Sequence, residues 1–261
     1  MIGKPDPQLT PDSVYQLVAE VGFQKYFHLD GFQATKTLLD RLEITADTNI
    51  LEVGCATGKT ACYIAKNYGC NIVGIDLLEG MVTRGNERAA RENVAHLVTF
   101  RQADAQDLPF EDDQFDLLLS EFVTGLLEDK TKGLLEYIRV VKPGGTLAFN
   151  EATWIKFPPP PDLVYFITQV FGVRSELLHQ EGWIDLLTNV GIKELTHTIH
   201  QAQDMSNPRE DLKDVIKVFP KMVSMVLRDP LFRKFIRTSL AIPKDITDYF
   251  GYGLYVGKVY A

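Results

Sequence analysis

Short apolar runs alternate with helical patterns along the middle of the chain. Five such runs occupy residues 50–53, 71–75, 97–100, 115–119 and 145–149. In several of the stretches between them, apolar residues recur every three or four positions, as on one face of a helix. Strands that alternate with helices favour right-handed crossovers and a parallel sheet that is covered on both faces. The pattern therefore predicts an α/β fold with helices on both faces of the sheet.

The first 48 residues have a helical pattern instead. Thr10 is expected to cap a first helix that has Pro11 at its first position. The apolar residues on one face of this helix are Val14, Leu17, Val18 and Val21. A second helix is expected to carry Leu38, Leu39 and Leu42 on its apolar side.

The pattern changes again after Glu151. Residues 157–161 read Phe-Pro-Pro-Pro-Pro, which predicts a stiff connector, because proline lacks the amide donor that a helix or a central strand needs. The remaining expected elements are helices over 163–178, 181–189 and most of 204–247, and strands over 194–200 and 252–260.

Composition and charge narrow the class of protein. The chain has 261 residues, of which 45% are hydrophobic and 24% charged, as in soluble globular proteins. Its net charge of −8 argues against a general nucleic-acid binder, which needs a basic surface. The first seven residues hold no apolar signal core, and the longest apolar stretch, near 163–173, is too short to span a bilayer. We therefore expect no integral membrane segment.

The cysteine content indicates a reducing compartment. Cys55, Cys62 and Cys70 are few and odd in number, which favours reduced thiols and a cytoplasmic location. They form no Cys-x-x-Cys pair, and no paired histidines accompany them. We expect no metal site.

The strongest chemical signal is the sequence Glu-Val-Gly-Cys-Ala-Thr-Gly at residues 52–58. Small residues between a strand and a helix let the backbone approach a ligand closely, at the sheet edge where α/β proteins bind ligands. A dinucleotide fingerprint would need glycines where Ala56 and Lys59 stand. A P-loop would need four residues between its first glycine and Gly-Lys-Ser/Thr, whereas three residues separate Gly54 from Gly58.

The spacing of Glu52, Gly54, Ala56 and Gly58 resembles motif I of class I S-adenosylmethionine-dependent methyltransferases. That motif usually has a glycine where this chain has Ala56. Further matches follow in the order and spacing of the family.

These further matches lie at the ends of the predicted strands. Asp76 ends the second strand, Asp104 follows the third, and Ser120 and Glu121 end the fourth. Residues 139–145 resemble the family's turn before the fifth strand. The core resembles the small-molecule type, which includes quinone, sterol and amine methyltransferases.

The resemblance implies a Rossmann-like sheet of seven strands, mostly parallel, with the last strand antiparallel. It implies an N-terminal helical cap over residues 1–48 and a methyltransferase domain over 49–261. Within that domain, residues 155–180 and 204–247 would form helical cap or insertion segments.

The resemblance also implies S-adenosylmethionine as cofactor, S-adenosylhomocysteine as product and no metal. Asp76 would accept hydrogen bonds from both ribose hydroxyls, Leu77 would pack on the adenine, and Asp104 would accept from the adenine amino group. The other residues expected at the cofactor are Glu52, Gly54, Cys55, Ala56, Gly58, Met81, Ala105 and Ser120. Cys55 is expected there as a small filler and not as a nucleophile.

The acceptor side of the site has weaker signals. His28 and Glu121 are candidate general bases for an acceptor that must lose a proton. Candidate substrate contacts are Tyr15, Tyr26, Glu151 and Trp154. Structural interpretations stay open beside these, since Asp76 could cap the next helix and Ser120 and Glu121 could form a solvated strand end.

Residues 205–245 are basic within an acidic chain, with nine basic and five acidic residues. Lys213, Lys217 and Lys221 fall on one helical stripe, which indicates a solvated face or a contact with an anionic substrate, a membrane surface or a partner. The apolar residues Phe219, Met222, Val223 and Met225 are expected to pack on the core.

We therefore expect a methyltransferase that moves a methyl group by in-line displacement to a small-molecule acceptor, through carbon, nitrogen or oxygen. Two other classes stay open. One is a regulatory protein that binds S-adenosylmethionine without catalysis, and the other is a nucleotide-binding protein with a P-loop-like turn. Nucleic acid is not expected as a partner, and both a monomer and a homodimer are compatible with the sequence.

Overall fold

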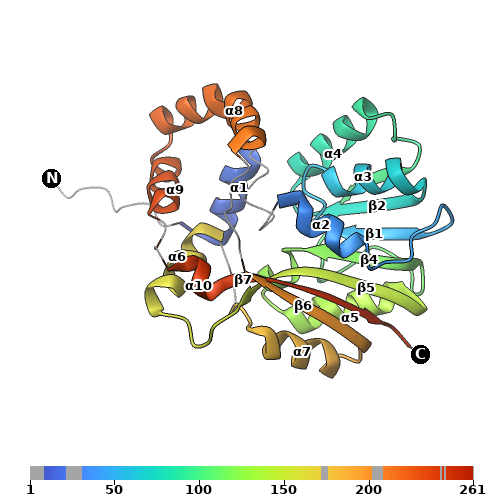
Figure 1. The fold of residues 1–261 in the computed structure, drawn as a ribbon. Helices are drawn as coiled ribbons and strands as arrows, with labels where there is room; N and C mark the ends of the chain where they lie inside the picture. The colour runs from blue at the N-terminus through green and yellow to red at the C-terminus, as the bar shows by residue number, and fades with distance from the viewer. Residues whose placement is uncertain are drawn as a thin grey trace.

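Seven strands form one sheet in the computed structural model, which describes residues 9–21, 31–171, 176–201, 208–241, 243 and 245–260. The strands are β1 (Asn49–Val53), β2 (Asn71–Asp76), β3 (Val98–Gln102), β4 (Phe115–Glu121), β5 (Val141–Trp154), β6 (Lys193–Gln201) and β7 (Phe250–Lys258). Their order across the sheet is β3-β2-β1-β4-β5-β7-β6 (Figure 1).

Strands β1 to β5 pair with one another in parallel, whereas β7 is antiparallel to both β5 and β6. This arrangement confirms the predicted α/β fold with an antiparallel last strand. The chain proceeds from β1 to β3 toward one edge of the sheet and then returns to β4 on the other side of β1. The carboxyl ends of β1 and β4 therefore form a topological switch point, where α/β sheets bind ligands.

Helices cover both faces of the sheet (Figure 1). The helices are α1 (Pro11–Val21), α2 (Gly31–Leu39), α3 (Lys59–Tyr68), α4 (Glu79–Arg91), α5 (Lys130–Val140), α6 (Pro161–Phe171), α7 (Gln180–Asn189), α8 (Pro208–Arg228), α9 (Pro230–Leu240) and α10 (Ile246–Tyr249), with a short 3-10 turn, η2 (Thr124–Leu126).

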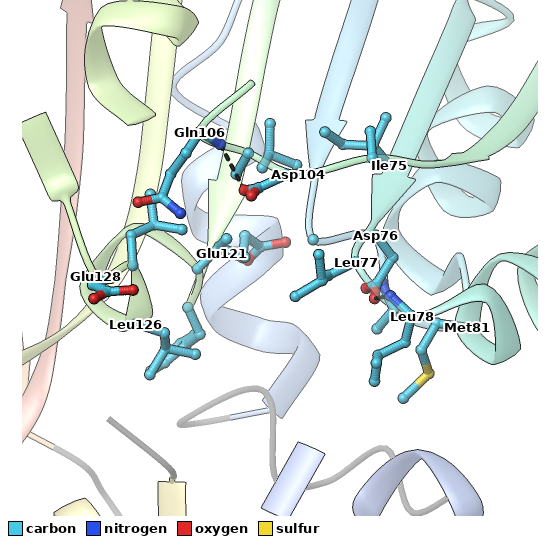
Figure 2. Close-up of a pocket in the computed structure, with 18 of the residues that line it drawn as sticks. Ile75, Asp76, Leu77, Leu78, Met81, Asp104, Gln106, Glu121, Leu126 and Glu128 are labelled. Carbon is cyan, nitrogen blue, oxygen red and sulfur yellow. Dashed lines mark hydrogen bonds between the residues drawn. The ribbon is translucent and has the colours of Figure 1, made fainter. Parts of the chain in front are cut away.

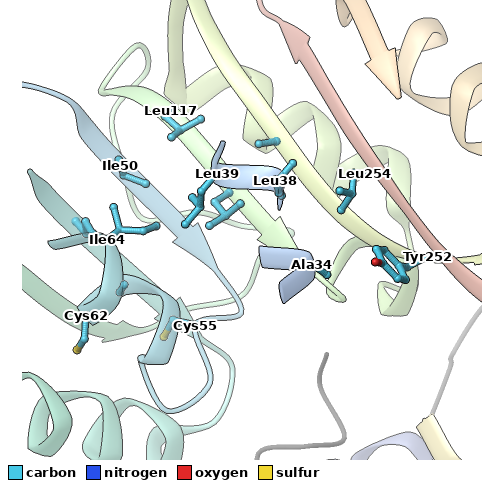
Figure 3. Packing of buried hydrophobic residues seen from close by; sticks show 14 of the residues in the cluster. Ala34, Leu38, Leu39, Ile50, Cys55, Cys62, Ile64, Leu117, Tyr252 and Leu254 are labelled. Atoms are coloured by element: carbon cyan, nitrogen blue, oxygen red, sulfur yellow. The ribbon is translucent and has the colours of Figure 1, made fainter. Parts of the chain in front are cut away.

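Alternation along the strands divides the core into two clusters. On β1, Ile50 packs in a cluster with Leu38 of α2 and Ile64 of α3 (Figure 3). Its neighbour Leu51 packs in the second cluster, with Leu134 of α5. Consecutive residues of one buried strand thus hold helices on opposite faces, as a continuous apolar run predicts.

A third apolar cluster lies outside the sheet, in a cap formed by α1, α6, α8 and α9. Its buried members are Leu9, Val14, Leu17, Val21, Met225, Phe232 and Phe235. Phe219 and Val223 of α8 are 58% and 41% exposed, so the expectation that they pack on the core is wrong. Helix α1 begins at Pro11 as expected, and the amide of Ser13 donates to Thr10 Oγ1 over 3.2 Å. The amide of Thr10 in turn donates to Ser13 Oγ over 2.8 Å.

The helix expected over 163–178 is shorter than predicted. Helix α6 ends at Phe171, and residues 176–178 are not helical. Tertiary contact explains the difference, because the carbonyl of Leu178 accepts from the amide of Trp154 on β5 over 3.0 Å. At the other end, Pro161 is part of α6 and not of the connector, since proline is tolerated in the first turn of a helix.

The turn expected over residues 139–145 is also different. Helix α5 continues to Val140, and β5 begins at Val141, which pairs with Phe115. The pairing then resumes between Leu117 and Thr146, so that the intervening residues bulge out of the ladder. Gly144 lies in this bulge with φ +81°.

Candidate active site

A pocket lies at the carboxyl ends of β1, β2 and β4, beside the loop that follows β3 (Figure 2). Eight residues that the sequence placed at the cofactor or in catalysis line it together. They are Gly54, Ala56, Asp76, Leu77, Met81, Asp104, Ala105 and Glu121. The pocket thus occupies the switch point, and residues far apart in the chain meet in it.

The loop after β1 has left-handed backbone at Gly54, Ala56 and Gly58, with φ of +70°, +46° and +72°. A Cβ at Gly54 would stand 2.1 Å from Val123 Cγ2, and one at Gly58 would stand 2.4 Å from the ring of Phe100. Both positions therefore require glycine for conformation and for space. Gly58 lies outside the pocket lining, at the start of α3.

Asp76 ends β2 and holds two backbone amides. Its Oδ1 accepts from the amide of Leu78 over 2.9 Å, and its Oδ2 accepts from the amide of Ala56 over 3.0 Å. Burial raises the pKa of this carboxyl group. Leu78 and not Asp76 is the N-cap residue of α4, so the helix-cap interpretation of Asp76 is wrong.

The neighbours of Asp76 make one wall of the pocket. Leu77 is 51% exposed although it is large and apolar, and Met81 on α4 is buried beside it. On the loop after β3, Asp104 Oδ1 accepts from the amide of Gln106 over 2.9 Å (Figure 2). This bond orients the carboxylate of Asp104, and Ala105 next to it is buried.

Glu121 lies at the end of β4 in a network of buried hydrogen bonds. Its Oε2 accepts from Thr35 Oγ1 over 2.8 Å and from Asn150 Nδ2 over 3.1 Å, and its Oε1 accepts from Thr60 Oγ1 over 3.2 Å. These donors come from α2, β5 and α3. Glu121 is only 7% exposed, so the interpretation of this strand end as solvated is wrong.

Glu52 on β1 does not line the pocket. Its carboxylate is buried, and Oε2 has no hydrogen-bond partner within the described part of the chain. Burial, together with the charge of Glu121, raises the pKa of Glu52 well above its usual value. A buried acceptor without a donor is costly for the stability of the fold.

Four other predicted site residues do not line the pocket. Ser120 is fully buried and shares a hydrogen bond of 3.0 Å with Thr124 Oγ1. Glu151 is also fully buried, and Trp154 packs on Phe250 in the core. Cys55 is buried as a small filler, and burial raises the pKa of its thiol well above the usual value.

Glu151 instead holds the turn that borders the pocket. Its Oε1 accepts from the amide of Thr124 over 2.9 Å, and its Oε2 accepts from the amide of Gly125 over 3.1 Å. Burial raises the pKa of Glu151 to about 7. The carboxylate therefore positions η2, whose Leu126 faces the pocket.

Tyr26 and His28 lie outside the described residues, as does the side chain of Tyr15. Other residues that line the pocket were not predicted from the sequence. They include Gln16, Gln106, Val123, Leu126, Leu127 and Glu128. All but Gln16 follow the ends of β3 or β4, and this position is the one signal that could have identified them.

Residues 51–149 match a family model described as a methyltransferase domain. The matched segment contains Asp76, Asp104 and Glu121, which meet in the pocket. This segment belongs to the methyltransferase domain of the class I S-adenosylmethionine-dependent type. The match leaves the cap helices outside and covers the part of the chain that carries the motif I loop.

Several curated relatives match parts of this chain. Tocopherol O-methyltransferase of Arabidopsis thaliana is 38% identical over 105 residues, which are 40% of this chain and 30% of that enzyme. An uncharacterized protein of Haemophilus influenzae is 29% identical over 62% of this chain and 65% of its own length. This chain therefore spans less than two thirds of either relative. The uncharacterized methyltransferase YodH of Bacillus subtilis is 29% identical over 88% of this chain and 92% of its own length.

Two solved structures have similar folds. The cyclase SpnF has a TM-score of 0.78 and 18% identity over 99% of this chain and 100% of its own. Phosphoethanolamine N-methyltransferase 2 of Haemonchus contortus has a TM-score of 0.72 and 16% identity over 97% of this chain and 58% of its own. Similarity at this level of sequence identity shows the fold alone. Because a cyclase and a methyltransferase share this fold, the reaction has to be argued from the site.

Proposed function

We propose that this chain binds S-adenosylmethionine in the pocket at the carboxyl ends of β1, β2 and β4 and transfers its methyl group to a small-molecule acceptor. The observation that carries this proposal is the meeting of Gly54, Asp76, Asp104 and Glu121 in one pocket. All four lie within the segment that matches the methyltransferase domain.

The two bonds that Asp76 accepts support a ribose site there. Each carboxylate oxygen has two lone pairs and uses one for a backbone amide, from Leu78 or from Ala56. The carboxylate is thereby fixed in orientation, and each oxygen has one further acceptor position. Two such positions suit the two adjacent hydroxyls of a ribose.

The residues next to Asp76 fit an adenine. Leu77 presents an apolar surface that is 51% exposed in the protein alone, and burial under a flat aromatic ring would remove it from water. Asp104 lies across the pocket with an oriented carboxylate, which suits the amino group of the base. Ala105 would contribute its backbone at the same place.

The other end of the pocket fits the methionine part. Glu52 lies two residues before Gly54, and an ammonium group near Gly54 would complement the charge of its carboxylate. Neutralisation of the buried negative charge would also offset the desolvation that raises the pKa of Glu52.

S-adenosylmethionine supplies a methyl group that its sulfonium already makes electrophilic. The task of the chain is to hold the acceptor about 3 Å from that carbon, in line with the sulfur. Glu121 places an oriented carboxylate at the end of β4, where we propose that it borders the reacting groups. It stays our candidate for a proton acceptor beside His28.

A second candidate function is binding of S-adenosylmethionine without methyl transfer. Ala56 favours it, because its methyl group and its φ of +46° depart from the glycine that motif I usually has at this place. Conversion of S-adenosylmethionine to S-adenosylhomocysteine with any acceptor would exclude this candidate.

We further propose that the protein works in the cytoplasm on an acceptor other than nucleic acid. Cys55, Cys62 and Cys70 are buried and unpaired, which suits a reducing compartment. The net charge of −8 disfavours nucleic acid. In the part of the chain that the structure describes, no helix has both the length and the apolar character to cross a membrane.

The direct test is calorimetric titration of the purified protein with S-adenosylhomocysteine, with ATP and NAD as controls. We expect tight binding of S-adenosylhomocysteine alone, followed by its formation from S-adenosylmethionine in a screen of acceptors. Folded, ligand-free protein that does not bind it would overturn the proposal. Binding of ATP without S-adenosylhomocysteine would favour the nucleotide-binding class.

A further inference from the structure

One side of helix α4 connects the pocket to the motif I loop, residues 54–58. Met81, Gly85 and Arg88 follow one another at intervals of four and three residues, so they lie on the same side of the helix. Met81 lines the pocket, whereas Gly85 and Arg88 do not (Figure 2). This side of α4 therefore runs from the pocket to the end of the loop that leads into α3.

Gly85 lets the loop approach α4 closely. A Cβ at Gly58 would stand 3.1 Å from the Cα of Gly85 and 2.4 Å from the ring of Phe100. A Cβ at Gly85 would in turn stand 2.9 Å from Cγ of the same ring. The ring of Phe100 thus packs against both glycines, and the end of the loop lies against α4.

Arg88 adds a charged hydrogen bond at this contact. Its Nε donates to the carbonyl of Thr57 over 2.9 Å, and its Nη1 donates to Glu92 Oε1 over 3.0 Å. The guanidinium is therefore oriented by a carboxylate one turn further along α4. Thr57 is 7% exposed and the side chain of Arg88 is 18% exposed. A charged donor is worth more than a neutral one where water is largely excluded.

The loop needs such contacts because its backbone is strained. Ala56 has φ +46°, and the two glycines of the loop are also left-handed. Asp76 fixes the loop at the amide of Ala56, and Arg88 fixes it at the carbonyl of the next residue, Thr57. A loop that is ordered before the ligand arrives costs less entropy on binding.

We infer that Arg88 is a positioning residue for S-adenosylmethionine, which holds the motif I loop in its binding shape without touching the cofactor. The inference rests on the proposed function, in which the loop borders the cofactor. Arg88 does not line the pocket, so its effect has to pass through Thr57. The sequence offered no signal for this role, because the two residues are 31 positions apart.

Hydrogen exchange of the free protein tests whether Arg88 holds the loop. The amides of Cys55, Ala56 and Gly58 all donate hydrogen bonds within the protein. We expect these amides to exchange faster in R88M than in the wild type, while the amides of β5 keep their wild-type rates. Methionine has a helix propensity similar to that of arginine, so α4 itself should be preserved.

Calorimetry with S-adenosylhomocysteine tests the effect on the cofactor. We expect R88M to bind about three- to tenfold more weakly than the wild type, as for the loss of one hydrogen bond that orders the site. A general loss of stability would not change this affinity, because the protein stays folded at the temperature of the titration. With an acceptor from the screen, R88M should raise KM for S-adenosylmethionine and leave kcat nearly unchanged.

Two further variants separate the contact from its charge. Arg91 lies exposed in the same last turn of α4, so R91M makes the same change of charge and should behave like the wild type. E92Q removes the carboxylate that orients the guanidinium and should weaken binding less than R88M does. In R88M/E92Q the loss should equal that of R88M, because Glu92 acts through Arg88.

Three results would overturn the inference. They are wild-type exchange of the loop in R88M, equal affinity of R88M and the wild type, and a loss in R91M as large as in R88M. If the wild type itself does not bind S-adenosylhomocysteine, the proposed function fails. The exchange experiment needs no ligand, so it still decides whether Arg88 holds the loop.

Discussion

The carboxylate of Asp76 holds the backbone of Ala56, with 3.0 Å between Oδ2 and the amide nitrogen. The bond connects the end of β2 to the loop after β1. It does so at Ala56, whose φ of +46° is favourable for glycine and unfavourable for alanine. The shape of the motif I loop therefore depends on a residue twenty positions further along the chain.

Replacing Ala56 with glycine should stabilise the protein. Left-handed backbone costs alanine about 1 kcal/mol, and the greater freedom of glycine in the unfolded chain offsets part of the gain. We expect A56G to raise the free energy of unfolding by about 0.5 kcal/mol in urea titrations. Ala103 lines the same pocket without left-handed backbone, so A103G should lower stability. If A56G is less stable than the wild type, the left-handed backbone at Ala56 is not a source of strain.

Removing the carboxylate of Asp76 should weaken cofactor binding. We expect D76A to lose about 1–3 kcal/mol of binding free energy for S-adenosylhomocysteine in calorimetry, the cost of unpaired buried hydroxyls. An analogue of S-adenosylhomocysteine that lacks the ribose 2′-hydroxyl distinguishes the loss of ribose recognition from damage to the motif I loop. The wild type should prefer the parent compound, and D76A should bind both alike. Equal affinity of D76A and wild type for the parent compound would refute the ribose assignment.

A methyl group at Gly54 should disturb the site in two ways. The new Cβ would stand 2.1 Å from Val123 Cγ2, and the φ of +70° would be strained. We expect G54A to lower both the unfolding midpoint and the affinity for S-adenosylhomocysteine. The second change V123A removes the nearest methyl and should restore part of the loss. If G54A/V123A is no better than G54A, the steric explanation fails.

Glu151 should make stability fall as pH rises from about 4.5 to 7. The pKa of its carboxyl group is raised from 4.5 to about 7 by burial. Within this window the folded state keeps the proton that the unfolded state has lost, so ionisation destabilises the fold by up to about 3 kcal/mol. E151Q should flatten this part of the stability curve, measured by urea unfolding at several pH values. E87Q, at an exposed position of α4, is the control and should leave the curve unchanged.

Glu121 and His28 should matter for turnover more than for binding. With an acceptor whose nucleophile must lose a proton, we expect E121Q or H28A to slow turnover by about 10²–10⁴-fold, measured as S-adenosylhomocysteine formed. Calorimetry should give wild-type affinity for the product. T35V removes one donor to Glu121 but leaves the carboxylate, so its effect should be smaller. Unchanged turnover in both E121Q and H28A would end the general-base hypothesis.

Local patterns were sufficient for the strands and for part of the pocket. The run at residues 50–53 is apolar because β1 is buried on both faces, and burial on both faces leaves a signal in consecutive residues. Gly54 and Gly58 were predictable because left-handed backbone in a turn at a strand end favours glycine. Asp76 and Asp104 were predicted through the resemblance to the methyltransferase family, and they meet because the carboxyl ends of parallel strands lie at one edge of the sheet.

The neighbours of a side chain were not predictable in this way. Glu151 was placed at the substrate, yet β5 lies inside the sheet between β4 and β7, and this position buries the carboxylate against the turn at Thr124. Phe219 has the spacing of a core residue, but Met225 on the other side of α8 fills the cap cluster first. A helical pattern predicts which residues share one side of a helix, but it does not predict which side other elements cover.

By itself the sequence determined the strands, the helices between them and the left-handed loop after β1, because strand period, helix period and left-handed turns are properties of a few adjacent residues. Only the tertiary structure decided the surroundings of Glu121, whose hydrogen-bond donors Thr35 and Asn150 lie 86 and 29 positions away in the chain. It also decided that Gln16 of α1 reaches the pocket. Contacts over such separations depend on how whole helices pack, and no local pattern records that packing.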